Sequence, residues 1–202
     1  MKIALIGATG NVGSRILDEL LSRGHVVTAI ARDIGKLSGR TGVTARVGDA
    51  KDPLALATLM NGCEAVISAV PFRNSDPGAL VKAVEASGVR RYLVVGGAGS
   101  LEVAPGVRLI DTPEFPEAYR HEAAAGAAFL DFLRTQDRLD WTFLSPSALF
   151  VPGERTGTFR LGKDQLLTGE KGSTISYEDY AVALVDELEK PAHSRQRFTV
   201  GY

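Results

Sequence analysis

The sequence predicts a single α/β domain in which helices cover both faces of a doubly wound parallel sheet. Two observations predict it. Short apolar runs alternate with segments whose apolar residues recur at helical spacing, and a glycine-rich turn joins the first run to the first such segment. Hydrophobic residues make up 45% of the 202 residues and charged residues 23%. That composition is typical of a chain with a packed core, and it excludes a disordered protein.

The first half of the chain repeats one strand–helix unit. Strands are expected at 2–6, 26–31, 43–47, 64–70 and 90–95, where apolar and β-branched residues run together. The first helix is expected at 11–22. Two more begin at Asp52-Pro53 and Asp76-Pro77, because Asp is a good N-cap and Pro suits the first helical position. Right-handed crossovers between such units give a parallel sheet.

The second half is less regular. We expect a loop at 101–116, which holds three prolines, then a long helix at 117–138 and a strand at 141–144. Residues 151–175 are expected to form a small substrate-side extension, with a hairpin of 158–161 and 165–167. Ser176 with Asp179 begins a last helix in the manner of a capping box, and 197–200 is expected to be an edge strand. No repeat or linker appears, so residues 1–202 are read as one domain.

The turn after the first strand has the spacing of a nucleotide-binding loop. Gly7 permits a tight turn, Gly10 lets the backbone approach a pyrophosphate, and Gly13 lets the helix pack on the strand. The helix N-terminus then presents free N–H groups and a positive dipole end to the anion. This is the arrangement of a Rossmann domain. The residues expected at the pyrophosphate are Gly7, Thr9, Gly10, Asn11 and Val12.

The end of the second strand favours NADP(H) over NAD(H). An acidic residue there would bind the 2′-hydroxyl, whereas an arginine accommodates the 2′-phosphate. The strand ends at Arg32, with Lys36 four residues beyond. Arg32 is the better phosphate ligand because its planar fork matches the oxygens. A solvated arginine at a strand end is the alternative, and NAD(H) stays open.

The ends of the third and fourth strands complete the expected cofactor site. Asp49 can accept a hydrogen bond from the adenine amino group, with Ala50 stacked nearby, although Asp after Gly is also common in turns. Ala69, Val70 and Pro71 follow the fourth strand at the edge where ligands bind in such sheets. Small residues there let the backbone pass along the cofactor's ribose.

Four later segments carry a family resemblance. They read Gly-Gly-Ala-Gly-Ser at 96–100, Leu-Asp-Trp-Thr-Phe-Leu-Ser-Pro at 139–146, Pro-Gly-Glu-Arg-Thr-Gly at 152–157 and Ile-Ser-Tyr-Glu-Asp-Tyr-Ala at 175–181. With the glycine turn, they make the whole chain resemble the atypical short-chain dehydrogenase/reductases of the NmrA-like kind. Within that group the chain is similar to the NADH-flavin reductase family, which resembles biliverdin reductase B/flavin reductase proteins. The resemblance implies a nicotinamide cofactor and a flavin or other planar acceptor.

The sequence lacks the acid–base pair of ordinary short-chain dehydrogenases. Those enzymes protonate a carbonyl with a tyrosine that is activated by a lysine four residues later, and none of the five tyrosines has that partner. Tyr119 stands near the family's position, but Ala123 replaces the lysine, and an unactivated phenol is a poor proton donor at neutral pH. Flavin reduction asks less, because hydride passes to flavin N5 and N1 can be protonated from water.

Further candidates lie on the substrate side. The resemblance implies that Ser100 faces the nicotinamide, with a loop hydroxyl bonded to its own backbone as the alternative. Arg155 and Thr156 can bind an anionic tail such as a flavin phosphate, with a surface salt bridge as the competitor. Tyr119 and Phe150 can offer aromatic walls to a planar ligand, or else pack in the core or at its rim.

We therefore expect an NADPH-dependent reductase of a flavin, quinone or tetrapyrrole-like acceptor, with FMN or FAD as substrate rather than as a tightly bound group. Two alternatives stay open. One is an NADP(H)-binding redox sensor that signals to a protein partner without turnover. The other is an epimerase or dehydratase, for which the sequence offers no general base.

Composition excludes several other classes. Lys and Arg total 23 against 24 Asp and Glu, so no basic excess exists for binding nucleic acid. The three histidines and the single cysteine show no metal-ligand spacing. No apolar run approaches the roughly 20 residues that span a bilayer, and no signal peptide is recognisable, so a cytoplasmic location is expected.

Overall fold

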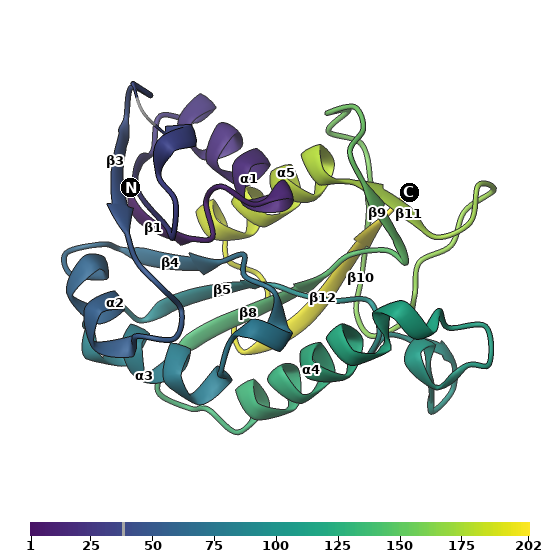
Figure 1. Ribbon diagram of the computed structural model, residues 1–202. Coiled ribbons are helices and arrows are strands. Elements are labelled where there is room, and N and C mark those ends of the chain that lie inside the picture. The colour runs from purple at the N-terminus through teal and green to yellow at the C-terminus, as the bar shows by residue number, and fades with distance from the viewer. Residues whose placement is uncertain (38) are drawn as a thin grey trace.

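The computed structural model describes residues 1–37 and 39–202 and confirms the predicted fold class (Figure 1). An eight-stranded sheet has the order β10-β12-β8-β5-β4-β1-β2-β3, and every neighbouring pair is parallel except β10 with β12. Its strands are β1 (Lys2–Ile6), β2 (Val26–Ala31), β3 (Val43–Val47), β4 (Ala65–Ser68), β5 (Arg91–Val95), β8 (Asp140–Ser145), β10 (Arg160–Gly162) and β12 (Gln196–Gly201).

Helices cover both faces of this sheet (Figure 1). On one face lie α1 (Asn11–Ser22) and α5 (Tyr177–Glu189), and on the other α2 (Pro53–Met60), α3 (Pro77–Ala86) and α4 (Glu117–Arg134). Each face therefore has its own buried core. Trp141 of β8 belongs to the core on the α4 side, where its indole N–H donates to the carbonyl of Gln136 at 3.3 Å.

The predicted helix starts are confirmed by their caps. The carboxylate of Asp52 accepts the amide of Ala55 at 3.1 Å, and that of Asp76 accepts the amide of Ala79 at 2.6 Å. The Ser176 hydroxyl caps α5 by accepting the Asp179 amide at 2.9 Å. These bonds satisfy first-turn N–H groups that have no partner inside the helix.

Two predicted ends are too long. Helix α4 stops at Arg134 rather than 138, because the chain must be extended by Asp140, whose amide donates to the carbonyl of Arg90 and starts the pairing of β8 with β5. Strand β4 covers Ala65–Ser68 rather than 64–70. Beyond Ser68 the chain leaves the sheet and becomes a wall of the cleft described below.

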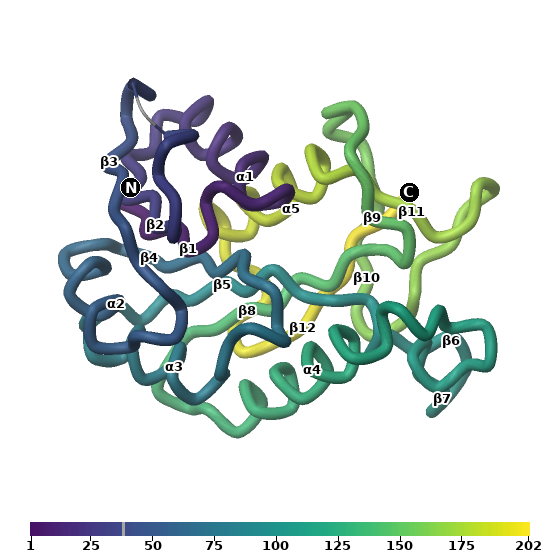
Figure 2. Tube along the Cα trace, viewed as in Figure 1, coloured from purple at the N-terminus to yellow at the C-terminus, as the bar shows by residue number. Residues whose placement is uncertain are grey.

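The prediction of a plain loop at 101–116 is wrong. Strands β6 (Glu102–Ala104) and β7 (Val107–Arg108) pair antiparallel around Gly106, whose φ of +74° suits a tight turn, and a 3₁₀ helix, η3 (Leu109–Asp111), follows. Figure 2 shows this hairpin beyond the N-terminal end of α4. Its prolines lie outside the paired residues, so they do not interrupt it.

The predicted hairpin of 158–161 with 165–167 does not form. Strand β10 pairs instead with β12, and Gln165 makes an isolated parallel bridge to Glu102. As a result β12 is an interior strand, not the predicted edge, and the short β10 covers it. A second unpredicted pair, β9 (Leu149–Val151) with β11 (Thr174–Ser176), runs parallel beside the main sheet. None of the described helices is both long and apolar enough to cross a membrane.

Candidate functional site

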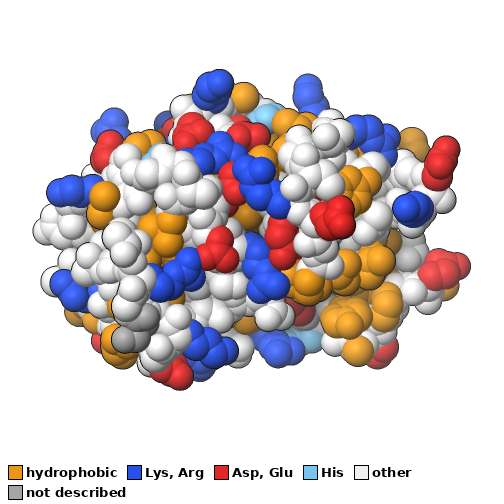
Figure 3. Space-filling view, turned by 90° about the horizontal axis from the view of Figure 1, so that it is seen from above, with side chains coloured by type: hydrophobic (Ala, Val, Ile, Leu, Met, Phe, Trp, Pro, Cys, Tyr) orange, Lys and Arg blue, Asp and Glu red, His pale blue; other side chains and the backbone are white. Residues whose placement is uncertain are grey.

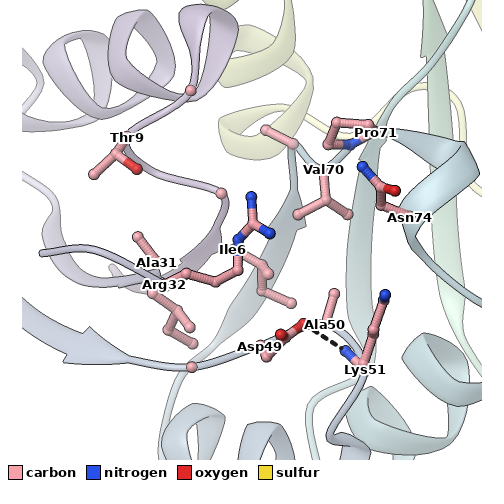
Figure 4. A pocket seen from close by; sticks show the side chains of 15 residues that line it. Ile6, Thr9, Ala31, Arg32, Asp49, Ala50, Lys51, Val70, Pro71 and Asn74 are labelled. Atoms are coloured by element: carbon pink, nitrogen blue, oxygen red, sulfur yellow. Dashed lines mark hydrogen bonds between the residues drawn. The ribbon is translucent and has the colours of Figure 1, made fainter.

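An open cleft of about 290 Å³ lies at the carboxyl ends of β1, β2, β3 and β4 (Figure 4). Parallel sheets bind ligands at this edge. Most of the predicted cofactor residues line it, namely Gly7, Thr9, Gly10, Arg32, Asp49, Ala50, Ala69, Val70 and Pro71. Residues from four separate loops are thus brought together as the sequence predicts, whereas Asn11, Val12 and Lys36 lie outside the lining.

The glycine turn is packed so closely that side chains would not fit. A Cβ on Gly7, whose φ is +85°, would lie 2.4 Å from the carbonyl oxygen of Ala69. The Gly7 amide donates to the carbonyl of Ile30 at 2.8 Å, which ties the turn to β2. The turn therefore contacts β2 and the residue that follows β4, and its backbone forms part of the cleft surface.

The N-terminus of α1 opens towards this turn. Its N-cap is Gly10, which has no side chain to bond the first amides of the helix. Those amides and the positive end of the helix dipole are therefore available to an anion. The geometry has the features that a pyrophosphate site requires, and the role of the turn in binding one stays a prediction.

Two cations and one carboxylate give the cleft its charge. Arg32, at the end of β2, directs its guanidinium into the cleft, and Lys51 lies on another side of it beside Asp49 (Figure 4). One Asp49 oxygen accepts the backbone amide of Lys51 at 3.0 Å, so the turn role weighed for Asp49 is observed. Its other oxygen has no hydrogen-bond partner within residues 1–37 and 39–202. The net positive lining suits a dinucleotide phosphate.

Sequence reasoning missed Lys51 and Asn74. Lys51 directly follows the Asp49-Ala50 pair, so its position was a usable signal. Asn74 ends a 3₁₀ helix, η2 (Phe72–Asn74), and neither helical nor strand periodicity marks so short an element. Figure 4 shows Asn74 on the same side of the cleft as Val70 and Pro71.

Ser100 lies outside the cleft lining. Its Oγ accepts a hydrogen bond from Nη1 of Arg197 at 3.3 Å, and the Arg197 side chain, 4% exposed, also donates to Asp164. The alternative in which Ser100 bonds its own backbone is not what the structure shows. The nicotinamide-facing role of Ser100 stays a prediction.

Tyr119 stands at the start of α4 with 66% of its surface exposed. Ala123 stands where the family has a lysine, and it packs against Gly99. A Cβ added to Gly99 would lie 2.7 Å from the Cβ of Ala123. Two other phenols, Tyr92 and Tyr180, are fully enclosed, and burial raises the pKa of each far above its usual value. These phenols therefore stay protonated at neutral pH.

The predicted substrate residues Phe150, Arg155 and Thr156 lie apart from the cleft lining. Phe150 packs with its ring centroid 4.7 Å from those of Tyr177 and Tyr180. Thr156 donates to the buried carboxylate of Asp179 at 2.6 Å. These contacts attach β9 and the segment that follows it to α5. The substrate roles of the three residues stay predictions.

Arg155 makes the salt bridge that was weighed as its alternative. Its Nε and Nη2 donate to the two oxygens of Glu19 at 2.7 and 2.8 Å. This hydrogen bonding is the main cause that lowers the pKa of Glu19, although burial acts to raise it and Arg23 adds to the lowering. Acidic and basic side chains alternate over the face that α1 and α5 cover (Figure 3).

Comparisons with known proteins agree with this geometry. The family model described as NAD(P)H-binding matches residues 7–191. The uncharacterized protein YwnB of Bacillus subtilis is 43% identical, and the alignment covers 99% of this chain and 98% of YwnB. A crystal structure from Bacteroides thetaiotaomicron, named a "putative epimerase", is 43% identical with a TM-score of 0.93, covering 100% of this chain and 96% of that one.

A second solved structure carries a more specific name. It is a "putative NADH-flavin reductase" from Streptococcus pneumoniae, 41% identical with a TM-score of 0.80, and the match covers 100% of this chain and 99% of that one. The family model spans the glycine turn and most of the sheet that supports it. This chain therefore belongs to the NAD(P)H-binding family, with the Rossmann fold of its oxidoreductases.

Proposed function

We propose that the protein is an NADPH-dependent reductase that passes hydride to a flavin or a similar planar acceptor. The observation that carries the proposal is the make-up of the cleft. The cleft is lined by a glycine turn at a helix N-terminus and by Arg32 at the end of β2. The described lining residues include no Tyr–Lys pair. The similarity to the Streptococcus pneumoniae reductase supports the same reaction class.

The residues present fit NADP(H). The amides at the start of α1 and the backbone of Gly7 and Gly10 would bind the pyrophosphate, and Arg32 would bind the 2′-phosphate. The free oxygen of Asp49 is placed to accept from the adenine amino group. When bound, the cofactor supplies a hydride. The chain's part is to hold two ring systems in contact, which needs orientation rather than a protein acid or base.

The acceptor is proposed to be a small molecule that binds and leaves freely, namely a flavin, a quinone or a tetrapyrrole-like compound. We also propose that residues 1–202 act as a single domain.

The test is a turnover assay. Purified protein would be mixed with NADPH, and the near-ultraviolet absorbance of NADPH would be followed with and without FMN over a series of enzyme concentrations. Oxidation that requires FMN and scales with enzyme is expected. Tight NADPH binding without turnover on FMN, quinone or biliverdin would instead indicate a redox sensor.

An epimerase is the second candidate, because the Bacteroides relative bears that name. Epimerisation needs a group that removes a proton or hydride and returns it on the opposite face. Tyr119 is an exposed phenol that stands near the position expected from the family resemblance, and Ala123 stands where those enzymes have a lysine. A sugar substrate that is epimerised with no net change in the amounts of NADP⁺ and NADPH would favour this candidate over the reductase.

A further inference from the structure

The short helix η2, which follows β4, is fastened to α4 by one carboxylate. Glu122 of α4 accepts the backbone amide of Phe72 with Oε1 at 2.7 Å and that of Arg73 with Oε2 at 3.1 Å. These are the first amides of η2, which have no partner within so short a helix. In the described part of the chain no Lys or Arg pairs with Glu122, so its charge is directed at these two amides.

The Phe72 side chain supplies a second attachment on the same face of α4. Its ring lies over Gly126, one turn after Glu122, and a Cβ on Gly126 would approach the ring to 2.9 Å. The ring also contacts Phe129 edge-on, with centroids 5.3 Å apart, and stacks on Phe143 at 5.9 Å. Glu122 holds the backbone of η2, and Gly126 leaves room for the Phe72 ring. Helix α4 therefore sets both the position and the rotation of η2.

This fastened segment is also a wall of the cleft. Val70 and Pro71 lead into η2 and Asn74 ends it, and all three line the cleft facing the loop of Asp49 (Figure 4). Glu122 itself lies outside the lining. The distance between the two walls therefore depends on where α4 holds η2.

We propose that Glu122 is a positioning residue for cofactor binding, which acts by holding the Val70–Asn74 wall at the spacing that the adenosine half of NADP(H) requires. The proposal rests on the proposed assignment of the cleft to this cofactor. A wall released from α4 would have to be ordered again each time ligand binds, and affinity would fall accordingly.

The test measures binding, without any acceptor. NADP⁺ and 2′,5′-ADP would be titrated by calorimetry into wild type, Glu122→Ala and Glu122→Gln, and the melting temperature of each ligand-free protein recorded. Glu122→Ala should raise both dissociation constants about tenfold, and Glu122→Gln, which keeps one acceptor oxygen, about threefold. Glu117→Gln is the matched control, because Glu117 lies on the same helix, is 87% exposed and, among the described residues, forms an ion pair with Arg120 alone. It should change neither constant.

A second variant disturbs the same wall through the contact between Gly126 and the Phe72 ring. Gly126→Ala would push Phe72 off α4 while leaving Glu122 intact, and alanine favours the helix itself. It should weaken both ligands to a similar extent, with KM for NADPH raised and kcat unchanged in any turnover assay. This variant decides the matter if Glu122→Ala does not fold.

The outcomes separate the two proposals. Dissociation constants within twofold of wild type for both Glu122→Ala and Gly126→Ala overturn the positioning role and leave the reductase intact. A fall in melting temperature without weaker binding does the same, since it shows a purely structural cap. A wild-type protein that binds neither ligand overturns the cofactor assignment together with this inference. Failure to reduce FMN, with the affinity changes present, overturns the flavin reductase alone.

Discussion

Gly13 packs directly against the carbonyl of Gly7, so closely that a Cβ on Gly13 would lie 2.1 Å from that oxygen. The contact joins α1 to the turn that it follows. Neither partner can move easily, because both atoms belong to the backbone.

Gly13→Ala is therefore expected to destabilise the protein by about 1–3 kcal/mol, although alanine by itself favours a helix over glycine. Urea unfolding of the ligand-free protein measures the change. Unaltered stability would show that α1 can shift away from β1 without cost.

Gly10→Ala should separate binding from stability. A Cβ on Gly10 meets its nearest atom, the Gly7 oxygen, at 3.4 Å, which is ordinary contact. The methyl group would stand where a pyrophosphate approaches the helix N-terminus. We expect unfolding stability within about 0.5 kcal/mol of wild type and NADP⁺ affinity about tenfold weaker. An affinity equal to that of wild type would show that the pyrophosphate binds at another place.

Arg32→Glu should convert cofactor preference. Removing the guanidinium takes away the charge-assisted bonds to the 2′-phosphate and adds a repelling carboxylate, so NADPH binding should weaken about a hundredfold while NADH binding changes little. Fluorescence titration with both cofactors measures this. Arg46→Glu is the control, since Arg46 is an exposed arginine of β3 that lies outside the cleft lining. Equal losses of affinity for NADPH and NADH would show that Arg32 does not bind the 2′-phosphate.

Arg155→Gln tests the salt bridge to Glu19 by its dependence on pH. Because Arg155 lowers the pKa of the folded Glu19 below the usual 4.5, the pair stabilises the protein above that pH and loses its effect as pH falls through the folded pKa. The substitution should cost about 1 kcal/mol at neutral pH, discounted for the exposure of Arg155. Urea unfolding should show the difference from wild type shrinking below pH 4.5. A difference that is constant across this range would mean that packing, not charge, is lost.

Tyr119→Phe addresses the alternative chemistries. Hydride transfer to a flavin needs no proton from a protein side chain, because N1 can be protonated from water, so kcat for FMN reduction should stay within about twofold of wild type. Steady-state kinetics at saturating NADPH would show it. A loss of a hundredfold or more would assign Tyr119 an acid–base role and revive the epimerase or dehydratase reading.

The sequence predicts those parts of the molecule whose signals are local. Asp52, Asp76 and Ser176 cap helices where they were expected to, because a cap needs only the three residues after it. The glycine turn and Arg32 each follow a strand that the sequence predicts, and the carboxyl ends of adjacent parallel strands share one edge, so the sequence also predicts that they line one cleft.

What escaped prediction depends on partners far away in the chain. Strand β10 overlaps the strand predicted at 158–161, but its partner is β12 near the end of the chain and not the neighbouring residues 165–167. For Arg155 the sequence left an anionic ligand and a salt bridge as alternatives, and it could not name Glu19, which is 136 residues away, as the partner. Glu122 gave no signal at all, because the amides it accepts follow a different strand.

Trp141 has a practical consequence for all of these measurements. It is the only tryptophan in the chain, 2% exposed in the core on the α4 side, so the intrinsic emission of the protein arises from one site. Unfolding brings that indole into water and shifts its emission to longer wavelength, which gives a single optical signal for every stability comparison proposed above. The reduced nicotinamide ring absorbs where indole emits, so NADPH titrations can be followed by energy transfer from this one donor without attaching a dye.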